Sequence, residues 1–134
     1  MNWALEVIVV PVSDVDRSRD FYEKKLGFHV DHDTKVNEST RVVQLTPPGS
    51  GCSVVIGTGI PKSECSIKGL QLVVNDLHKA HAQLVANGVA VSDITRMGDN
   101  PPGFEGDELD NVGFIFFSDP DGNEWAIQQI SSRP

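Results

Sequence analysis

The sequence has 134 residues, of which 39% are hydrophobic and 22% charged, a composition typical of a globular domain and not of a disordered chain. Nineteen acidic residues against eleven basic ones give a net charge of −8, which excludes nucleic acid and anionic membranes as favoured partners. No window is apolar enough for a membrane span, and no signal-peptide pattern opens the chain. Because Cys52 and Cys65 form no CxxC pair, we expect a reduced, cytoplasmic protein.

The chain begins with an apolar run, VIVVPVSDV at residues 7–15, that leads from a strand into a helix. Asp14 can accept hydrogen bonds from the free N–H groups of the first helical turn. Gly27 is placed to end the helix in the left-handed conformation. Three stretches of strand character follow, at residues 28–33, 39–46 and 52–58.

The same order of elements returns 62 residues later. GLQLVVNDL at 69–77 aligns without a gap with the first run, and Asp76 takes the capping place of Asp14. A helix ending at Gly88 then precedes three predicted strands at 89–94, 112–118 and 123–130, the last two joined by DPDG. Two copies of strand-helix-strand-strand-strand predict two modules, about 1–62 and 63–134, in a single domain over 1–134.

The segment HVDHD in the first module contains four residues that can bind metals. In a regular strand, His29, Asp31 and Asp33 point to one face and His32 to the other. We therefore expect a solvated strand face here and no convergent metal site.

PVSDVDRSRDFYEKKLGF in the first module and SDPDGNEWAIQ in the second resemble the vicinal oxygen chelate superfamily. This superfamily contains glyoxalase I, extradiol dioxygenases and bleomycin-binding resistance proteins. The resemblance covers nearly the whole chain and implies an α+β fold, in which two βαβββ modules with curved mixed sheets enclose a cavity, usually in a homodimer.

The metalloenzymes of this superfamily hold a divalent ion with His or Glu side chains from the first and last strand of each module. The resemblance places these positions at Val7, Ile56, Gly69 and Ala126. None of these residues has an oxygen or nitrogen donor in its side chain, so we expect no metal and no cofactor.

The alternation of strand residues, counted from these positions, predicts which side chains face the cavity. They are Leu5, Val7, Val9, Val54, Ile56, Thr58, Gly69, Gln71, Val73, Glu124, Ala126 and Gln128. This mostly apolar set, with a few polar groups, suits a mainly hydrophobic organic ligand oriented by a few hydrogen bonds, although a filled core is the alternative.

The longest irregular stretch, residues 95–113, holds five acidic residues and Phe104. Long loops inside compact domains are often functional. We expect a mobile lid whose acids attract a cationic ligand and whose Phe104 gives an apolar contact. The alternative is a loop that is merely solvated.

These features favour a metal-independent family member that binds a small organic molecule, as the sequestering resistance proteins do. The expected ligand contacts are Val7, Val9, Val54, Ile56, Gly69, Gln71, Phe104, Ala126 and Gln128. One alternative is a metal-independent enzyme in which Glu124 acts as general acid or base. A second is a metal-dependent glyoxalase-like lyase or dioxygenase.

Overall fold

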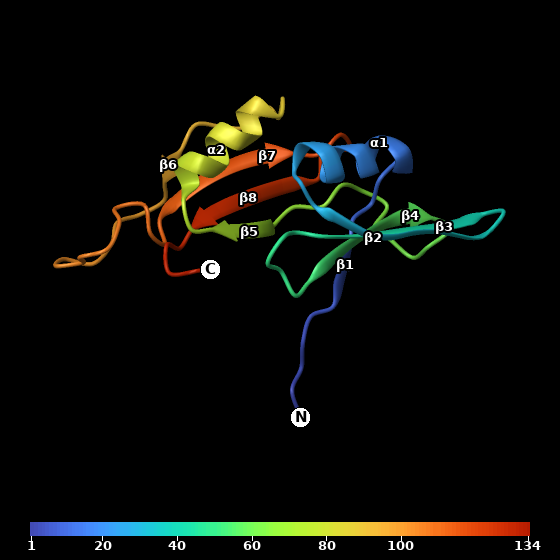
Figure 1. Ribbon diagram of the computed structural model, residues 1–134, viewed down its shortest axis with the longest axis horizontal. Helices are drawn as coiled ribbons and strands as arrows, with labels where there is room; N and C mark the ends of the chain where they lie inside the picture. The colour runs from blue at the N-terminus through green and yellow to red at the C-terminus, as the bar shows by residue number, and fades with distance from the viewer. The chain divides into compact units, whose positions relative to one another are not determined.

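The computed structural model describes all 134 residues, which form two compact units. The first contains Met1–Ile67 and the turn Asp119–Asn123, and the second contains Lys68–Ser118 and Glu124–Pro134. Each unit has a four-stranded mixed sheet and one helical region, and neither sheet closes into a barrel (Figure 1). The predicted α+β class and the order of elements in two βαβββ modules are confirmed. The single domain stays a prediction.

The first unit has its strands in the order β1-β4-β3-β2, with β1 parallel to β4 and the other pairs antiparallel. Asp14 caps the helix, as predicted, by accepting a hydrogen bond from the Arg17 amide at 3.1 Å. The helix ends before Gly27, which has a positive φ of 77°. The elements are β1 (Val7–Val9), α1 (Val15–Asp20), the π-helical turn η1 (Phe21–Lys25), β2 (His29–Asn37), β3 (Thr40–Thr46) and β4 (Ser53–Thr58).

One face of this sheet packs against α1 and forms the core of the unit. The register pairs Ile56 with Val43 and Val54 with Leu45, so these four side chains share that face. All four are buried. Burial of such aliphatic side chains stabilises the unit by about 1.5–3 kcal/mol each.

The prediction that Val54 and Ile56 face the cavity together with Val7 and Val9 is therefore wrong by one residue. Val9 lies opposite Val55 in the parallel pair, and Val7 has the parity of Val9. The two predicted pairs consequently point to opposite faces of the sheet. Alternation within one strand does not reveal this, because the register between strands decides which parity is buried.

A bulge in β2 overturns the expected alternation of HVDHD. Val30 pairs with Leu45 and His32 with Gln44, which leaves Asp31 as the extra residue. The bulge brings His32 to the same face as His29, opposite to the face expected from regular alternation.

Asp33 lies on the opposite face of β2 and connects this strand to α1. Its carboxylate accepts hydrogen bonds from Arg41 at 2.7 and 2.9 Å and also from Arg19 of α1. The Arg41 guanidinium, followed by that of Arg19, lowers the pKa of Asp33 from 3.8 to about 2. Arg41 also contacts Asp16 at 2.8 Å, so one ionic cluster holds the exposed hairpin against the helix.

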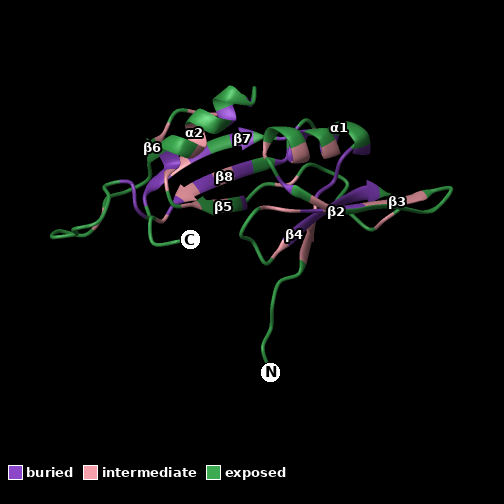
Figure 2. Ribbon diagram, viewed as in Figure 1, coloured by how far each residue is buried: buried purple, intermediate pink, exposed green.

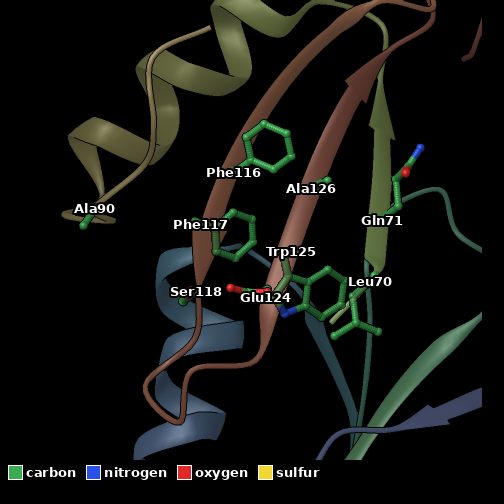
Figure 3. Close-up of a pocket in the computed structure, with 10 residues that line it drawn as sticks. Leu70, Gln71, Ala90, Phe116, Phe117, Ser118, Glu124, Trp125 and Ala126 are labelled. Carbon is green, nitrogen blue, oxygen red and sulfur yellow. The ribbon is translucent and has the colours of Figure 1, made fainter. Parts of the chain in front are cut away.

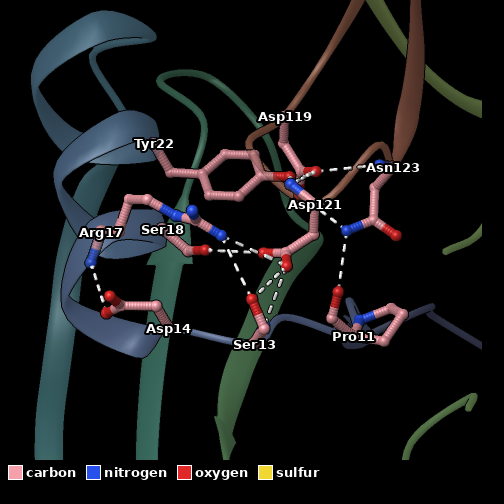
Figure 4. Close-up of polar contacts among 9 residues, drawn as sticks. All are labelled: Pro11, Ser13, Asp14, Arg17, Ser18, Tyr22, Asp119, Asp121 and Asn123. Atoms are coloured by element: carbon pink, nitrogen blue, oxygen red, sulfur yellow. Dashed lines mark hydrogen bonds and ion pairs between the residues drawn. The ribbon is translucent and has the colours of Figure 1, made fainter. Parts of the chain in front are cut away.

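The DPDGN turn supplies the first unit with a buried polar cluster (Figure 4). Asp119 accepts hydrogen bonds from the Tyr22 hydroxyl at 2.7 Å and from the Asn123 side chain at 2.7 Å. It also accepts from the backbone N–H groups of Asp121 and Asn123. Asn123 in turn donates to the Pro11 carbonyl at 2.8 Å. The FY and DPDGN motifs therefore have a structural role, since their polar atoms satisfy each other.

The second unit repeats this arrangement, with the strand order β5-β8-β7-β6 and β5 parallel to β8. Asp76 caps its helix through the Lys79 amide at 3.1 Å, as predicted. Beneath the helix, Ile115 and Ile127 are paired and buried, and Phe117 stacks on Trp125. Figure 2 shows buried stretches along both β7 and β8. The elements are β5 (Leu70–Val74), α2 (Leu77–Ala86), β6 (Thr95–Arg96), β7 (Gly113–Ser118) and β8 (Glu124–Gln129).

The strand predicted at 89–94 is absent, and β6 has only two residues. Ser92 explains the difference. Its amide donates to the Phe116 carbonyl at 2.9 Å, but its hydroxyl, and not a backbone carbonyl, accepts the Phe116 N–H at 2.9 Å. The segment therefore lies along β7 without a regular ladder. No helix of the chain has the length and apolar character needed to cross a membrane.

Candidate functional site

The sheet of the second unit has one face without a covering helix, and this face carries the candidate site. The register places Gln71 opposite Ala126, and Ala126 opposite Phe116. In the neighbouring row, Glu124 lies opposite Ser118. Paired residues point to the same side, so these five side chains form one surface across three strands.

A pocket of about 690 Å³ opens on this surface (Figure 3). This volume lies within the range of small-molecule sites, about 300–1,000 Å³. Its lining mixes apolar and aromatic groups with a few polar ones. The lining residues are Gly69, Leu70, Gln71, Ala90, Phe116, Phe117, Ser118, Glu124, Trp125 and Ala126.

Two phenylalanines from β7 give the surface an aromatic wall that the sequence analysis missed. The rings of Phe114 and Phe116 are nearly parallel, with centroids 6.1 Å apart and an angle of 8° between their planes. Phe116 is 39% exposed, so part of its ring is open to a ligand. The signal was present in GFIFFS, because the short DPDG turn sets the pairing of β7 with β8. The prediction considered only the first and last strand of each module.

A hydrogen-bonded pair of amides borders the aromatic wall. Gln71 donates through Nε2 to Gln128 Oε1 at 2.9 Å, and Gln128 donates through Nε2 to the Asn111 carbonyl at 2.8 Å. Both glutamines are among the ligand contacts predicted from the sequence, and the structure brings them together. They can orient a ligand by directional hydrogen bonds.

Glu124 lies at the other end of the pocket, where β8 begins. Its carboxylate is 3.7 Å from the Lys68 ammonium, and its side chain is 52% exposed. A carboxylate paired with a lysine and half open to water is well solvated. This environment suits electrostatic contact with a ligand better than acid-base catalysis in an apolar cavity.

The first unit presents a different helix-free face. Asp31 accepts hydrogen bonds from Thr46 and from Gln44, the latter at 3.4 Å. Gln44 and Thr46 also contact the buried Ser53 hydroxyl at 3.3 and 2.6 Å. His29 is 3.9 Å from Asp31. This polar row, defined as Asp31, Gln44, Thr46 and Ser53, uses most of its hydrogen-bonding capacity internally.

Phe104 and the acidic loop lie apart from the pocket. Phe104 is not among the lining residues, and its ring packs against Gly106 of its own loop. Residues 101–108 are exposed and project away from β7 and β8 (Figure 2). Of the five acids, Asp110 is buried and structural. Ser131 and Gln129 donate hydrogen bonds to its carboxylate and lower its pKa.

The residues at the metal-ligand positions of the metalloenzymes that this chain resembles do not fit a metal here. Val7, Gly69 and Ala126 offer no donor atom, and Val55, which the observed register puts in place of Ile56, offers none either. No three His, Cys, Asp or Glu side chains gather anywhere in a geometry that could hold a metal ion. The side chains at these four positions are therefore unsuited as ligands of a divalent cation.

The family model of the Glyoxalase/Bleomycin resistance protein/Dioxygenase superfamily matches residues 4–127. The chain belongs to this superfamily. Its members share the arrangement of modules described above, and the resemblance carried by the sequence motifs is thereby confirmed. A comparison with curated proteins gives no significant match.

Several solved structures are similar to this chain along almost their whole length. TnmS3, an antibiotic binding protein from Streptomyces sp. CB03234, is 30% identical, with 97% of this chain and 98% of that one covered and a TM-score of 0.72. A glyoxalase/bleomycin resistance protein from the same strain is 31% identical, with 94% and 100% covered and a TM-score of 0.69. A superfamily member from Sphaerobacter thermophilus DSM 20745, 24% identical, shares the fold, with coverage of 96% and 98% and a TM-score of 0.74.

Proposed function

We propose that this protein binds a small, mainly apolar organic molecule on the helix-free face of its second unit and releases it unchanged. The observation that carries the proposal is the pocket of about 690 Å³ with the exposed Phe116 ring as one wall. Small-molecule sites typically combine such an apolar surface with a few polar groups. The similarity to an antibiotic binding protein at 30% identity supports a sequestering role, in which the ligand is an antibiotic or a related natural product.

We further propose that binding requires no metal. Hydrocarbon side chains or hydrogen stand at the four family ligand positions, so nothing there can hold a Lewis acid against a substrate. Holding a ligand needs only shape, apolar contact and a few hydrogen bonds. The ligand contacts expected in the pocket are Gly69, Gln71, Phe116 and Ala126, with Glu124 at its end.

The test is a thermal-shift screen of aromatic and cationic antibiotics, followed by calorimetry on each hit. We expect a hit whose affinity falls about tenfold in Phe116→Ala, because part of the apolar contact is lost. Val85→Ala is the matched control, since Val85 is 55% exposed on α2 and is not a lining residue. A panel without any stabilising compound, or hits that bind Phe116→Ala as well as wild type, would contradict the proposal.

Two further measurements separate sequestration from catalysis. The bound ligand, recovered after hours and analysed by mass spectrometry, should be unchanged, and chelator-treated protein should bind it with the same affinity. Conversion to product that stops in Glu124→Gln would favour the metal-independent enzyme. A stoichiometric transition metal in protein purified without added metal would favour the metal-dependent alternative.

A homodimer belongs to the same proposal and is supported by the resemblance to the family and by exposed apolar residues near the N-terminus. Trp3 and Leu5 are 90% and 67% exposed and precede the edge strand β1, which offers unpaired backbone groups. Light scattering coupled to gel filtration should give twice the mass of the chain. We also propose a cytoplasmic location, where Cys52 and Cys65, both free thiols, would stay reduced.

A further inference from the structure

The two amides beside the pocket are fixed in orientation by a chain of hydrogen bonds that ends on the backbone. Gln128 Nε2 lies 2.8 Å from the Asn111 carbonyl oxygen, which can only accept, so the nitrogen of this amide must face it. Asn111 is itself held in place, because its N–H donates to the Gln129 carbonyl at 2.9 Å. The direction of the Gln128 amide is therefore determined by the fold.

This orientation passes on to Gln71. With its nitrogen on Asn111, Gln128 turns Oε1 toward Gln71 and receives Nε2 of that residue at 2.9 Å. Gln71 must then direct its own Oε1 away from Gln128. No group of the protein donates to this oxygen. In the polar row of the first unit, by contrast, the side chains largely bond to each other. The pocket thus has a hydrogen-bond acceptor that is pre-oriented and unused (Figure 3).

The acceptor lies at the edge of an otherwise apolar strip. Gln71, Ala126 and Phe116 are consecutive partners across β5, β8 and β7. Adjacent strands are about 4.8 Å apart, so about 10 Å separates the backbones of Gln71 and Phe116, with only the Ala126 methyl group between them. A flat polycyclic molecule that stacks on Phe116 can extend over Ala126 and bring a polar group at its far edge to Gln71.

On this basis, and resting on the proposed function, we infer that the pocket selects planar polycyclic aromatic ligands carrying a hydrogen-bond donor, which bonds Gln71 Oε1. A phenolic hydroxyl or an amide N–H has the required chemistry. Gln128 is a positioning residue, since it acts through the amide of Gln71.

The test uses 9-phenanthrol and 9-methoxyphenanthrene, two fluorescent probes that differ in the donor. Titration of the full chain should show about tenfold tighter binding of 9-phenanthrol, the effect of one hydrogen bond to an otherwise unpaired acceptor. The Nε2 group of Gln71 keeps one hydrogen, which could donate to the methoxy oxygen of 9-methoxyphenanthrene. Equal binding of the two probes would therefore overturn the inference.

Three variants locate the effect. Gln71→Leu should abolish the preference for 9-phenanthrol. Gln128→Leu leaves Gln71 in place but frees its amide to turn, so the preference should fall toward equality. Phe116→Ala should weaken both probes by the same factor and retain the preference. A preference that persists in Gln71→Leu would show that the donor is recognised elsewhere and would overturn the inference.

Failure of this inference is distinguishable from failure of the proposed function. If the probes bind equally, or if neither binds while compounds of the antibiotic panel do, the donor selectivity is wrong and small-molecule binding stands. If no compound of either set binds, both are wrong. Thermal unfolding of each variant, which should stay within a few degrees of wild type because Gln71 is exposed, verifies that the variants fold.

Discussion

The helix-free faces of the two sheets have the same strand order and opposite chemistry. In the first unit, the Asp31 carboxylate is surrounded by hydroxyl and amide groups that bond to it and to each other. In the second, Phe116 and Ala126 form an apolar strip, and the amide of Gln71 keeps a free acceptor. The polar row of the first face makes most of its hydrogen bonds internally, whereas the second face keeps an exposed aromatic ring and an acceptor without a donor in the protein.

The helix-covered faces, in contrast, are alike. Ile56 in β4 and Ile127 in β8 have corresponding positions on last strands that run parallel to the first strand of each module, and both are buried. Most of the buried side chains of each unit lie on this face, because the helix covers only one side of the sheet. The other side of the second sheet carries the proposed ligand site, so the core and that site make different demands on the same strands.

The largest expected effects on stability come from substitutions on the helix-covered faces, which are alike in the two units. Ile56→Ala and Ile127→Ala should each lower the free energy of unfolding by about 3–4 kcal/mol, because each leaves a cavity in a packed core. Val7→Ala, on the helix-free face and only half-buried, is the control and should cost about 1 kcal/mol. Chemical denaturation measures all three. If only one of the two isoleucine variants lost less than about 1 kcal/mol in free energy of unfolding, the two helix-covered faces would differ.

A second pair of variants compares the buried carboxylates. Asp119 in the first unit and Asp110 in the second are 5% and 7% exposed, and each accepts several hydrogen bonds. Alanine at either position leaves buried donors unpaired, so we expect losses of about 2–3 kcal/mol. Tyr22→Phe removes a single bond to Asp119 and should cost about 1 kcal/mol. Equal stability of Asp119→Ala and wild type would contradict a structural role for the DPDGN motif.

Much of the fold could be predicted from the sequence because its signals are local. Asp14 and Asp76 cap the start of each helix by a hydrogen bond within one turn, and Gly27 ends the first helix because it adopts a positive φ. The strand predicted at 89–94 is absent because one side chain, that of Ser92, replaces a backbone partner. Strand propensity does not reveal that a side chain takes the place of a backbone carbonyl.

The site was harder to predict because it depends on pairing between strands. Gln71 and Ala126 were placed correctly on one surface, since the parallel register happens to agree with the count from the family positions. Ile56 was misplaced because the corresponding count in the first unit differs from the true register by one residue. His32 and Asp33 were misplaced because a bulge at Asp31 shifts the alternation of β2. Neither feature leaves a signal within its own strand.

The ionic cluster around Asp33 makes the stability of the first unit depend on pH through ion pairs between its hairpin and α1. In the second unit, the pKa of the buried Asp110 is also lowered, but by neutral donors. Since the pKa of Asp33 is lower in the folded chain, about 2 against 3.8, its stabilisation is complete above about pH 4 and disappears as the pH falls toward 2. Exposure to solvent limits the contribution to about 1 kcal/mol. Between about pH 5 and 2.5, Asp33→Asn should therefore lose about 1 kcal/mol less stability than wild type. Asp20→Asn, which removes an exposed pair with Lys24, is the control for the loss of a surface ion pair and should change the free energy of unfolding at pH 7 by less than about 0.5 kcal/mol.

The smallest stability effects, and the sharpest contrast, are expected on the helix-free faces themselves. Phe116→Ser should change the free energy of unfolding by less than about 1 kcal/mol, because the ring is partly exposed, yet it should remove most of the aromatic ligand affinity. Thr46→Val deprives Asp31 of a donor, so it should cost about 0.5–1 kcal/mol and leave ligand binding unchanged. Calorimetric titration and denaturation of both variants separate the two roles. If Thr46→Val weakens binding as much as Phe116→Ser does, the polar row also contacts the ligand, and the two faces do not differ in function as their chemistry predicts.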